Sequence, residues 1–237
     1  MTLIINTQLA TPPSSQAASP KISNQDKSLL YKSLSISFVQ SDLMPNPSKI
    51  KENGPFKWSE LKNIVNNNQL ELLARSKNET QRYLDFKTWL KLENLNIQDY
   101  IIKYELNWQD AVSDAKLFTR SDDVKILLNK FPYYFEDDVT HFCIWSKVQI
   151  PNDPDSQIGD LSKHTRLIID KYVRKTFPNN QLLWFRNWAN LQSVKLISHI
   201  HVLVKGLDNE TLHNLLGSSG NLLTDEDYLE LETDETS

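Results

Sequence analysis

The chain has 237 residues and a formal net charge of -4 at pH 7, with 26 Lys and Arg against 30 Asp and Glu. This balance excludes the basic excess that is typical of a general nucleic-acid binder, and no apolar run approaches the roughly 20 residues that cross a bilayer. A single cysteine excludes a disulfide framework and a four-thiolate zinc site. We therefore expect no nucleic-acid partner and no membrane partner.

The two ends of the chain differ from the middle. Residues 1–50 are rich in Ser, Pro, Asn and Gln and contain no tryptophan, which predicts a disordered head. The head lacks the charged start and apolar stretch of a secretory signal and is not Arg-rich like a mitochondrial presequence, so we predict a cytoplasmic protein. Seven of the 30 acidic residues lie in 221–237. We predict an acidic flexible tail over 217–237, solvated or, alternatively, docking on a protein partner through Leu222, Leu223, Tyr228, Leu229 and Leu231.

The tryptophans locate the folded part. All six lie between 58 and 188, and because large aromatic side chains carry much of the burial in a core, we predict one domain over 51–216. In its first half, apolar residues recur at helical spacing in 58–65 and 70–73, around Tyr83, Phe86 and Leu90, and in 97–106.

The second half of the domain is predicted to be mixed. Residues 124–128, 139–148, 182–186 and 199–204 are strand-like in composition. Ser162 is a plausible cap for a helix to Phe177, and a short helix is expected over 211–216. The fold class is thus α+β, with a helical N-terminal half packed on a small, mainly antiparallel sheet with one further helix.

The strongest local feature is the sequence His199-Ile200-His201 in a predicted strand. Residues two apart on a strand share a face, so the imidazoles are expected about 7 Å apart on one side of the sheet. Such a pair can act as an acid-base pair, an anion clamp or part of a metal site. The alternative is structural, with one histidine buried and hydrogen-bonded and the other on the surface.

Two specific chemistries lack required residues. The third position of a His-x-His-x-His strand, as in histidine-triad nucleotide hydrolases, is Leu203. A metal would need a third ligand, and His141, Asp137, Asp138 and Asp160 have no spacing that selects one of them. The five glycines never form a dinucleotide or P-loop pattern. We therefore assign no metal and no cofactor.

A second cluster, Trp184 to Trp188, alternates aromatic and polar residues around Arg186 and Asn187. It could stack a ring and hold a phosphate, or it could be an aromatic core strand with Arg186 at the edge. Lys147 and Trp145 would add to the first arrangement if their strand is a neighbour. Cys143 is expected to be a small buried apolar residue, and we do not propose it as a nucleophile.

Several of these pieces occur together in one order along the chain. They include Trp58-Ser59-Glu60-Leu61, Phe131-Pro132-Tyr133, Trp145-Ser146-Lys147, Trp184-Phe185-Arg186-Asn187 and the strand 199–204. The series, over about 55 to 206, resembles the fungal N-acetylglucosamine-induced protein family, which is built on a domain of unknown function.

The resemblance implies a cytoplasmic protein linked to N-acetylglucosamine or chitin-precursor metabolism, and it brings no assigned reaction. We expect the motif positions Arg186, Asn187, Lys147 and Trp145 to line a ligand site, with His199 and His201 as the candidate catalytic pair. Three hypotheses stay open: a protein that binds a phosphorylated amino sugar or a nucleotide sugar, a hydrolase or transferase acting on such a compound, and a non-catalytic interaction protein.

Overall fold

A four-stranded antiparallel sheet forms the centre of the computed structural model, which describes residues 46, 49–178 and 180–235. The strand order is β1-β2-β4-β3. The strands are β1 (Val124–Leu128), β2 (Val139–Ser146), β3 (Gln181–Phe185) and β4 (Ser198–Lys205). The predicted α+β class and antiparallel sheet are confirmed. The predicted disordered head, 1–50, lies almost wholly outside the described residues.

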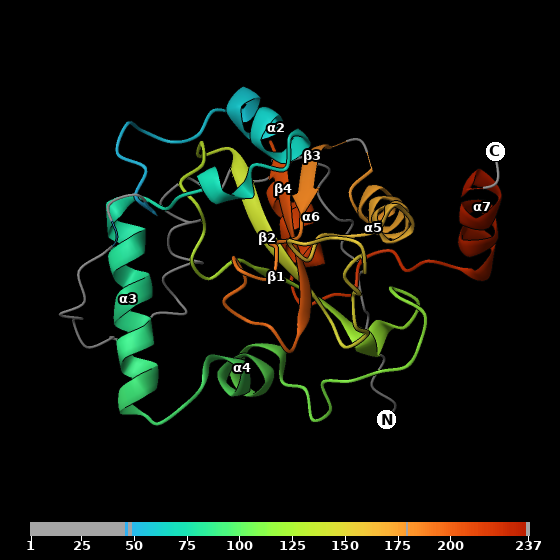
Figure 1. Ribbon diagram of the computed structural model, residues 1–237, viewed down its shortest axis with the longest axis horizontal. Helices are drawn as coiled ribbons and strands as arrows, with labels where there is room; N and C mark the ends of the chain where they lie inside the picture. The colour runs from blue at the N-terminus through green and yellow to red at the C-terminus, as the bar shows by residue number, and fades with distance from the viewer. Residues whose placement is uncertain (1–45, 47–48, 179, 236–237) are drawn as a thin grey trace, which may run out of the picture.

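Helices cover both faces of the sheet. The described part of the chain has six α-helices: α2 (Trp58–Asn66), α3 (Lys77–Leu92), α4 (Ile97–Tyr100), α5 (Lys163–Thr176), α6 (Asn209–Leu215) and α7 (Asp225–Glu235). Short 3-10 turns lie at Leu70–Leu72 and Ser121–Asp123. In Figure 1, α3 stands on one side of the sheet and α5 and α7 on the other. Within the described ranges, no helix combines the length and the apolar character needed to cross a membrane.

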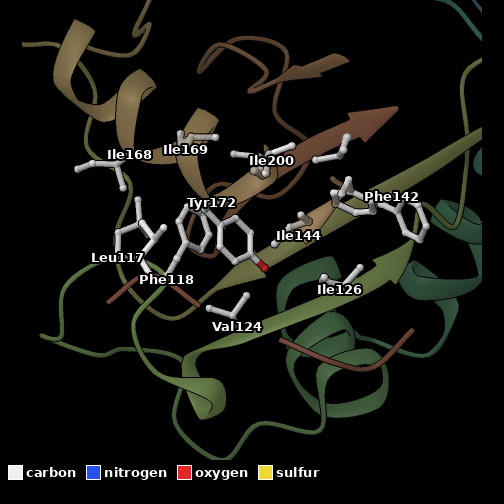
Figure 2. Close-up of a cluster of buried hydrophobic side chains, with 14 of the residues drawn as sticks. Leu117, Phe118, Val124, Ile126, Phe142, Ile144, Ile168, Ile169, Tyr172 and Ile200 are labelled. Atoms are coloured by element: carbon white, nitrogen blue, oxygen red, sulfur yellow. The ribbon is translucent and has the colours of Figure 1, made fainter. Parts of the chain in front are cut away.

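The larger apolar core lies between the sheet and α5 (Figure 2). Alternate residues of the central strands, such as Phe142, Ile144 and Ile200, point to this side and are fully buried. The α5 helix begins where expected, because the Ser162 hydroxyl accepts a hydrogen bond from the backbone N–H of Thr165. Its apolar face then packs on the strands and fixes the position of the whole sheet.

The opposite face of the sheet carries the histidines of the central strands. All eight residues of β2 are buried, so this face is covered as well. Smaller apolar clusters contributed by α2, α3 and α4 enclose it. Polar side chains on this face are therefore held in a protein interior and must find partners within it.

The third predicted helix differs from a regular one. After α4 the chain continues as a π-helix over Ile101–Leu106, which Asn107 ends in the left-handed conformation (φ 52°). The wider turn brings Tyr100 and Glu105 together, and the tyrosine hydroxyl donates to the carboxylate at 2.9 Å. Such single π-turns frequently occur at functional sites, and this one supplies part of a cavity wall.

The acidic C-terminus is folded onto the domain, which corrects the prediction of a flexible tail. Leu223, Tyr228 and Leu231 are buried in the larger core, whereas Leu229 is 61% exposed. The Tyr228 hydroxyl donates to the Leu117 carbonyl at 2.7 Å. Lys175 pairs with Asp227 at 2.5 Å, so basic residues of α5 receive the acidic helix. The acidic composition of the segment gave no sign of these contacts in the sequence. The predicted domain boundary at residue 216 stays a prediction.

Candidate functional site

A cavity of about 100 Å³ lies on the polar face of the sheet, under α3, α4 and the π-helix. Its walls are aromatic on the helix side, where Phe86 and Tyr100 line it, and polar on the sheet side. The polar wall on the sheet side includes Asn187, His199 and His201. The cavity therefore offers apolar surface and hydrogen-bonding groups to one small molecule, as ligand sites in proteins generally do.

A pair of buried histidines lies beneath the cavity, which only His201 of the two lines. His141 on β2 and His201 on β4 are 1% and 5% exposed, and His141 Nε2 lies 3.0 Å from His201 Nδ1. The register explains the approach, because Cys143 is directly opposite His201 and places His141 diagonally beside it. In the sequence, His141 was only one of four candidates for a third metal ligand.

Two asparagines determine how the histidine pair is protonated. The Asn187 amide donates from Nδ2 to His201 Nε2 (3.1 Å), so the ring proton of His201 is on Nδ1 and is donated to His141 Nε2. Asn129 is oriented by accepting from the backbone N–H of Phe131 (2.9 Å), and its Nδ2 donates to His141 Nε2 (3.2 Å). In this arrangement one proton lies between the two rings, and the ring proton of a neutral His141 is on Nδ1, which is buried without a partner in the described chain.

Burial keeps the pair uncharged. Desolvation, reinforced by the positive charge of Arg75, lowers the pKa of His141 to about 3. The pKa of His201 is well below its ordinary value, chiefly because of burial and then because of the charge on neighbouring His141, His199 and Arg75. At neutral pH both imidazoles are hydrogen-bonding groups and not cations.

His199 is not hydrogen-bonded to this pair and has a different partner. Its Nδ1 donates to the Ile197 carbonyl at 3.1 Å, which leaves Nε2 as an acceptor without a partner among the described residues. Trp145, its neighbour across the strands, lies against the ring with centroids 4.5 Å apart. Burial lowers the pKa of His199. The expected shared face of His199 and His201 is confirmed by the register, and both side chains prove to be buried.

Arg75 brings a cation to the cavity that the sequence analysis missed. Its guanidinium lies over the rings of Tyr83 and Tyr133, 4.6 Å and 5.2 Å from their centroids, and its Nε donates to the Phe131 carbonyl. The two Nη groups have no acceptor within the described chain. Arg75 precedes the α3 cap, Ser76, and only the tertiary structure brings it to the sheet, so no local pattern could have found it.

A second cation at the cavity is already neutralised. Lys130 donates to the Glu105 carboxylate at 2.5 Å and to the Tyr100 hydroxyl at 3.0 Å. Burial and the adjacent Glu105 raise the pKa of Tyr100. This network closes one side of the cavity. Of the two described cations on the cavity wall, Arg75 is therefore the one with unused hydrogen-bond donors.

The residues expected to line a site are only partly brought together. Asn187 and Trp145 line the cavity with the two histidines of β4. Lys147 does not, because it follows the end of β2 and lies over the Trp108 ring at 5.4 Å. Arg186 is buried and donates to the carbonyls of Ile150 and Gly159, so it holds a loop together.

Cysteine and metal chemistry find little support in the arrangement. Cys143 lies 3.6 Å from His201 Nδ1, yet burial raises the pKa of its thiol to about 12, so the nucleophilic thiolate is absent at neutral pH. Across residues 46, 49–178 and 180–235, no three His, Cys, Asp or Glu side chains are grouped so that they could hold a metal ion.

The fold and site define a small α+β domain with a buried, neutral histidine pair beside an aromatic cavity. The chain belongs to the family described as protein of unknown function (DUF3605), whose model matches residues 57–205. It is 43% identical to N-acetylglucosamine-induced protein 1 of Candida albicans, over 96% of each chain. It is 31% identical to an uncharacterized protein of Saccharomyces cerevisiae, YPL067C, over 63% of this chain and 78% of that one.

One solved structure is similar to this chain. The crystal structure of HTC1 matches with a TM-score of 0.59 and 28% identity, covering 71% of this chain and 100% of that chain. The predicted resemblance to the N-acetylglucosamine-induced family is confirmed by the match to N-acetylglucosamine-induced protein 1.

Proposed function

We propose that this chain is a cytoplasmic binding protein for an N-acetylated amino sugar or its phosphate ester, and that the central cavity is the binding site. The observation that carries the proposal is the set of unused polar groups on the cavity wall. Asn187 Oδ1 is buried without a partner in the described chain, His199 Nε2 is an unused acceptor, and Arg75 has unused donors.

These groups match the chemistry of such a ligand. Sugar hydroxyls and the amide N–H are donors for Asn187 and His199, and a phosphate or acetamido oxygen is an acceptor for Arg75. The apolar face of a sugar ring and the acetamido methyl group suit the aromatic wall. The cavity, of about 100 Å³, is smaller than most ligand pockets, which hold roughly 300–1,000 Å³. It therefore excludes a nucleotide sugar, which the sequence also left open, and an amino sugar would enter it only with the helical wall displaced. The relative named N-acetylglucosamine-induced protein 1 supports the choice of sugar.

The identity of the ligand is tested by thermal unfolding of the full chain. The panel is N-acetylglucosamine, its 6-phosphate, glucose 6-phosphate and UDP-N-acetylglucosamine. A ligand at about 100 times its dissociation constant stabilises the fold by about 2.7 kcal/mol, which raises the unfolding midpoint by a few degrees. We expect a shift for N-acetylglucosamine, and a larger shift for its 6-phosphate than for glucose 6-phosphate or UDP-N-acetylglucosamine. A panel without any shift contradicts the proposal.

The role of Arg75 is tested by calorimetric titration of Arg75→Met. Losing a charge-assisted contact to phosphate costs about 1.5–3 kcal/mol, so we expect the affinity for the 6-phosphate to fall by roughly 10- to 100-fold. Lys62→Met, which removes an exposed cation on α2, is the matched control and should bind normally. Equal affinity of Arg75→Met and the unchanged chain would place the ligand elsewhere. Circular dichroism of both variants establishes that they are folded.

A second candidate function rests on His199. The Ile197 carbonyl fixes its proton on Nδ1, and the free Nε2 is thereby oriented as a general base. This supports a hydrolase or transferase acting on the same sugar phosphate. Hydrolysis of the phosphate ester by the full chain, in which water gives the free sugar and inorganic phosphate, would establish this function if it is lost in His199→Gln while ligand affinity is kept. Activity unchanged in His199→Gln would exclude the imidazole as the base.

The interaction hypothesis keeps little of its original basis. Of the five apolar residues expected to anchor the C-terminus on a partner, Leu223, Tyr228 and Leu231 are buried in the chain's own core and Leu222 packs against it. Only Leu229 is exposed. Recruitment of a protein through this segment would require α7 to leave its site.

A further inference from the structure

His199 also lines a second pocket, of about 150 Å³, which shares no other residue with the central cavity. Its walls come from the segment 149–152, from the loop that follows β3 and from the start of β4. The residues with polar side chains that matter here are Gln149, Arg186, Gln192, Lys195 and Ser198. This pocket is not used by the proposed function.

The charge of the second pocket is positive. Arg186 and Lys195 both line it, and none of its lining residues carries a carboxylate. Lys195 is exposed and has no acidic partner in the part of the chain that the structure describes. Arg186 is 6% exposed. The carboxylate of Asp160 interacts with its charge, but Asp160 is not one of the residues that line the pocket. An anion entering the pocket would therefore meet two cations without a competing negative charge on the wall.

Hydrogen-bond donors in the pocket remain available. The Ser198 hydroxyl oxygen accepts from the Ile150 N–H (2.8 Å), which leaves its own proton to donate. Arg186 donates through its Nη groups to Ile150, Asn152 and Gly159, while its Nε has no acceptor among the described residues. Because those contacts hold the guanidinium in place, its charge is positioned before any ligand arrives.

We propose that this pocket is a binding site for a phosphate-type oxyanion, held by Lys195, the Arg186 guanidinium and the Ser198 hydroxyl. The ionised oxygens of phosphate accept hydrogen bonds and do not donate them. A pocket lined by cations and free donors matches this chemistry. The site is separate from the central cavity and stands whether or not an amino sugar binds there. It adjoins that cavity through the His199 ring and through Gln192, whose Nε2 donates to the Asn187 carbonyl at 2.7 Å.

The test is calorimetric titration of the full chain with inorganic phosphate and, separately, with glycerol 3-phosphate. We expect binding in the unchanged chain and about tenfold weaker binding in Lys195→Gln, since a hydrogen bond to a charged group is lost. Lys62→Gln is the matched control and should bind normally. Tighter binding of the ester than of phosphate would identify the ligand as a phosphomonoester, and the reverse order would identify it as the free anion.

Arg75→Met separates this site from the central cavity. The site proposed here predicts that inorganic phosphate binds Arg75→Met as tightly as the unchanged chain. Phosphate binding that is lost in Arg75→Met and kept in Lys195→Gln would place the anion in the central cavity and overturn the second site. Failure of phosphate to bind the unchanged chain at millimolar concentration would overturn it as well. Neither result affects binding of unphosphorylated N-acetylglucosamine, which tests the proposed function independently.

Discussion

Acidification should destabilise this protein steeply, well above the pH at which carboxylates titrate. His141 and His201 are neutral in the folded chain, because burial lowers the pKa of the first to about 3 and that of the second well below its ordinary value. In the unfolded chain both titrate near 6.5. The unfolded state therefore binds more protons as the pH falls below 6.5, and stability that is fully present above this pH is lost toward the folded-state pKa.

The expected size of the effect follows from linkage. Each such histidine contributes a slope of about 1.4 kcal/mol per pH unit, so the pair lowers the free energy of unfolding by about 3 kcal/mol for each unit below 6.5. His199, whose pKa is also lowered by burial, steepens the beginning of this fall. Urea unfolding followed by circular dichroism between pH 7.5 and pH 5 measures the slope directly.

Two variants distinguish the buried histidines from the others. His141→Asn removes one titrating group and should give a shallower dependence on pH, even though the variant is less stable at pH 7.5. His213→Asn changes an exposed histidine on α6 and should leave the slope unaltered. A free energy of unfolding that stays constant from pH 7.5 to pH 5 would show that the pair is not neutral and buried as described.

The second large effect concerns the acidic C-terminus. Tyr228 is 8% exposed and donates to the Leu117 carbonyl, so Tyr228→Ala should lower the free energy of unfolding by about 3 kcal/mol, as truncation of a buried aromatic side chain generally does. Tyr228→Phe removes only the hydrogen bond and should cost about 1 kcal/mol. Leu229→Ala is the control: its side chain points outward and the change should stay within about 0.5 kcal/mol.

Chemical denaturation of the three variants decides between a docked helix and a flexible tail. If Tyr228→Ala and Leu229→Ala have the same stability, α7 contributes nothing and the prediction from composition holds. The reason that composition misled is visible in the contacts. The acidic residues Asp227 and Glu230 pair with Lys175 and Lys171 on α5. The sequence suggested that these carboxylates are solvated, whereas in the structure they complement the charge of α5.

Local pattern was sufficient for most of the fold. Helical spacing predicted α2 and α5, and the strand-like runs predicted all four strands to within two residues at each end. Ser162 was identified as a cap because its effect is local. The π-helix after Tyr100 could not be predicted, since its spacing differs from a regular helix by one residue per turn and depends on how Glu105 meets Lys130. Pairing between distant segments likewise has no signal in a single sequence.

The site was predictable where its residues lie in local motifs, which include Trp145 and Asn187 as well as the two histidines of β4. The alternation in His199-Ile200-His201 is enough to place two imidazoles on one face. His141, Asn129 and Arg75 reach the same place from three other segments, and only the fold brings them together. Arg186 was expected to hold a phosphate from its residue type alone; backbone carbonyls of the loop after β2 occupy its Nη groups, so its charge and its Nε are what it offers to an anion.

The most direct test of the account is a crystal structure of the full chain with N-acetylglucosamine 6-phosphate. We expect ligand density in the central cavity, with the ligand contacting Asn187 and the phosphate oxygens within hydrogen-bonding distance of the Arg75 Nη atoms. Density at another site, with the central cavity filled only by solvent under conditions that saturate binding in solution, would contradict it.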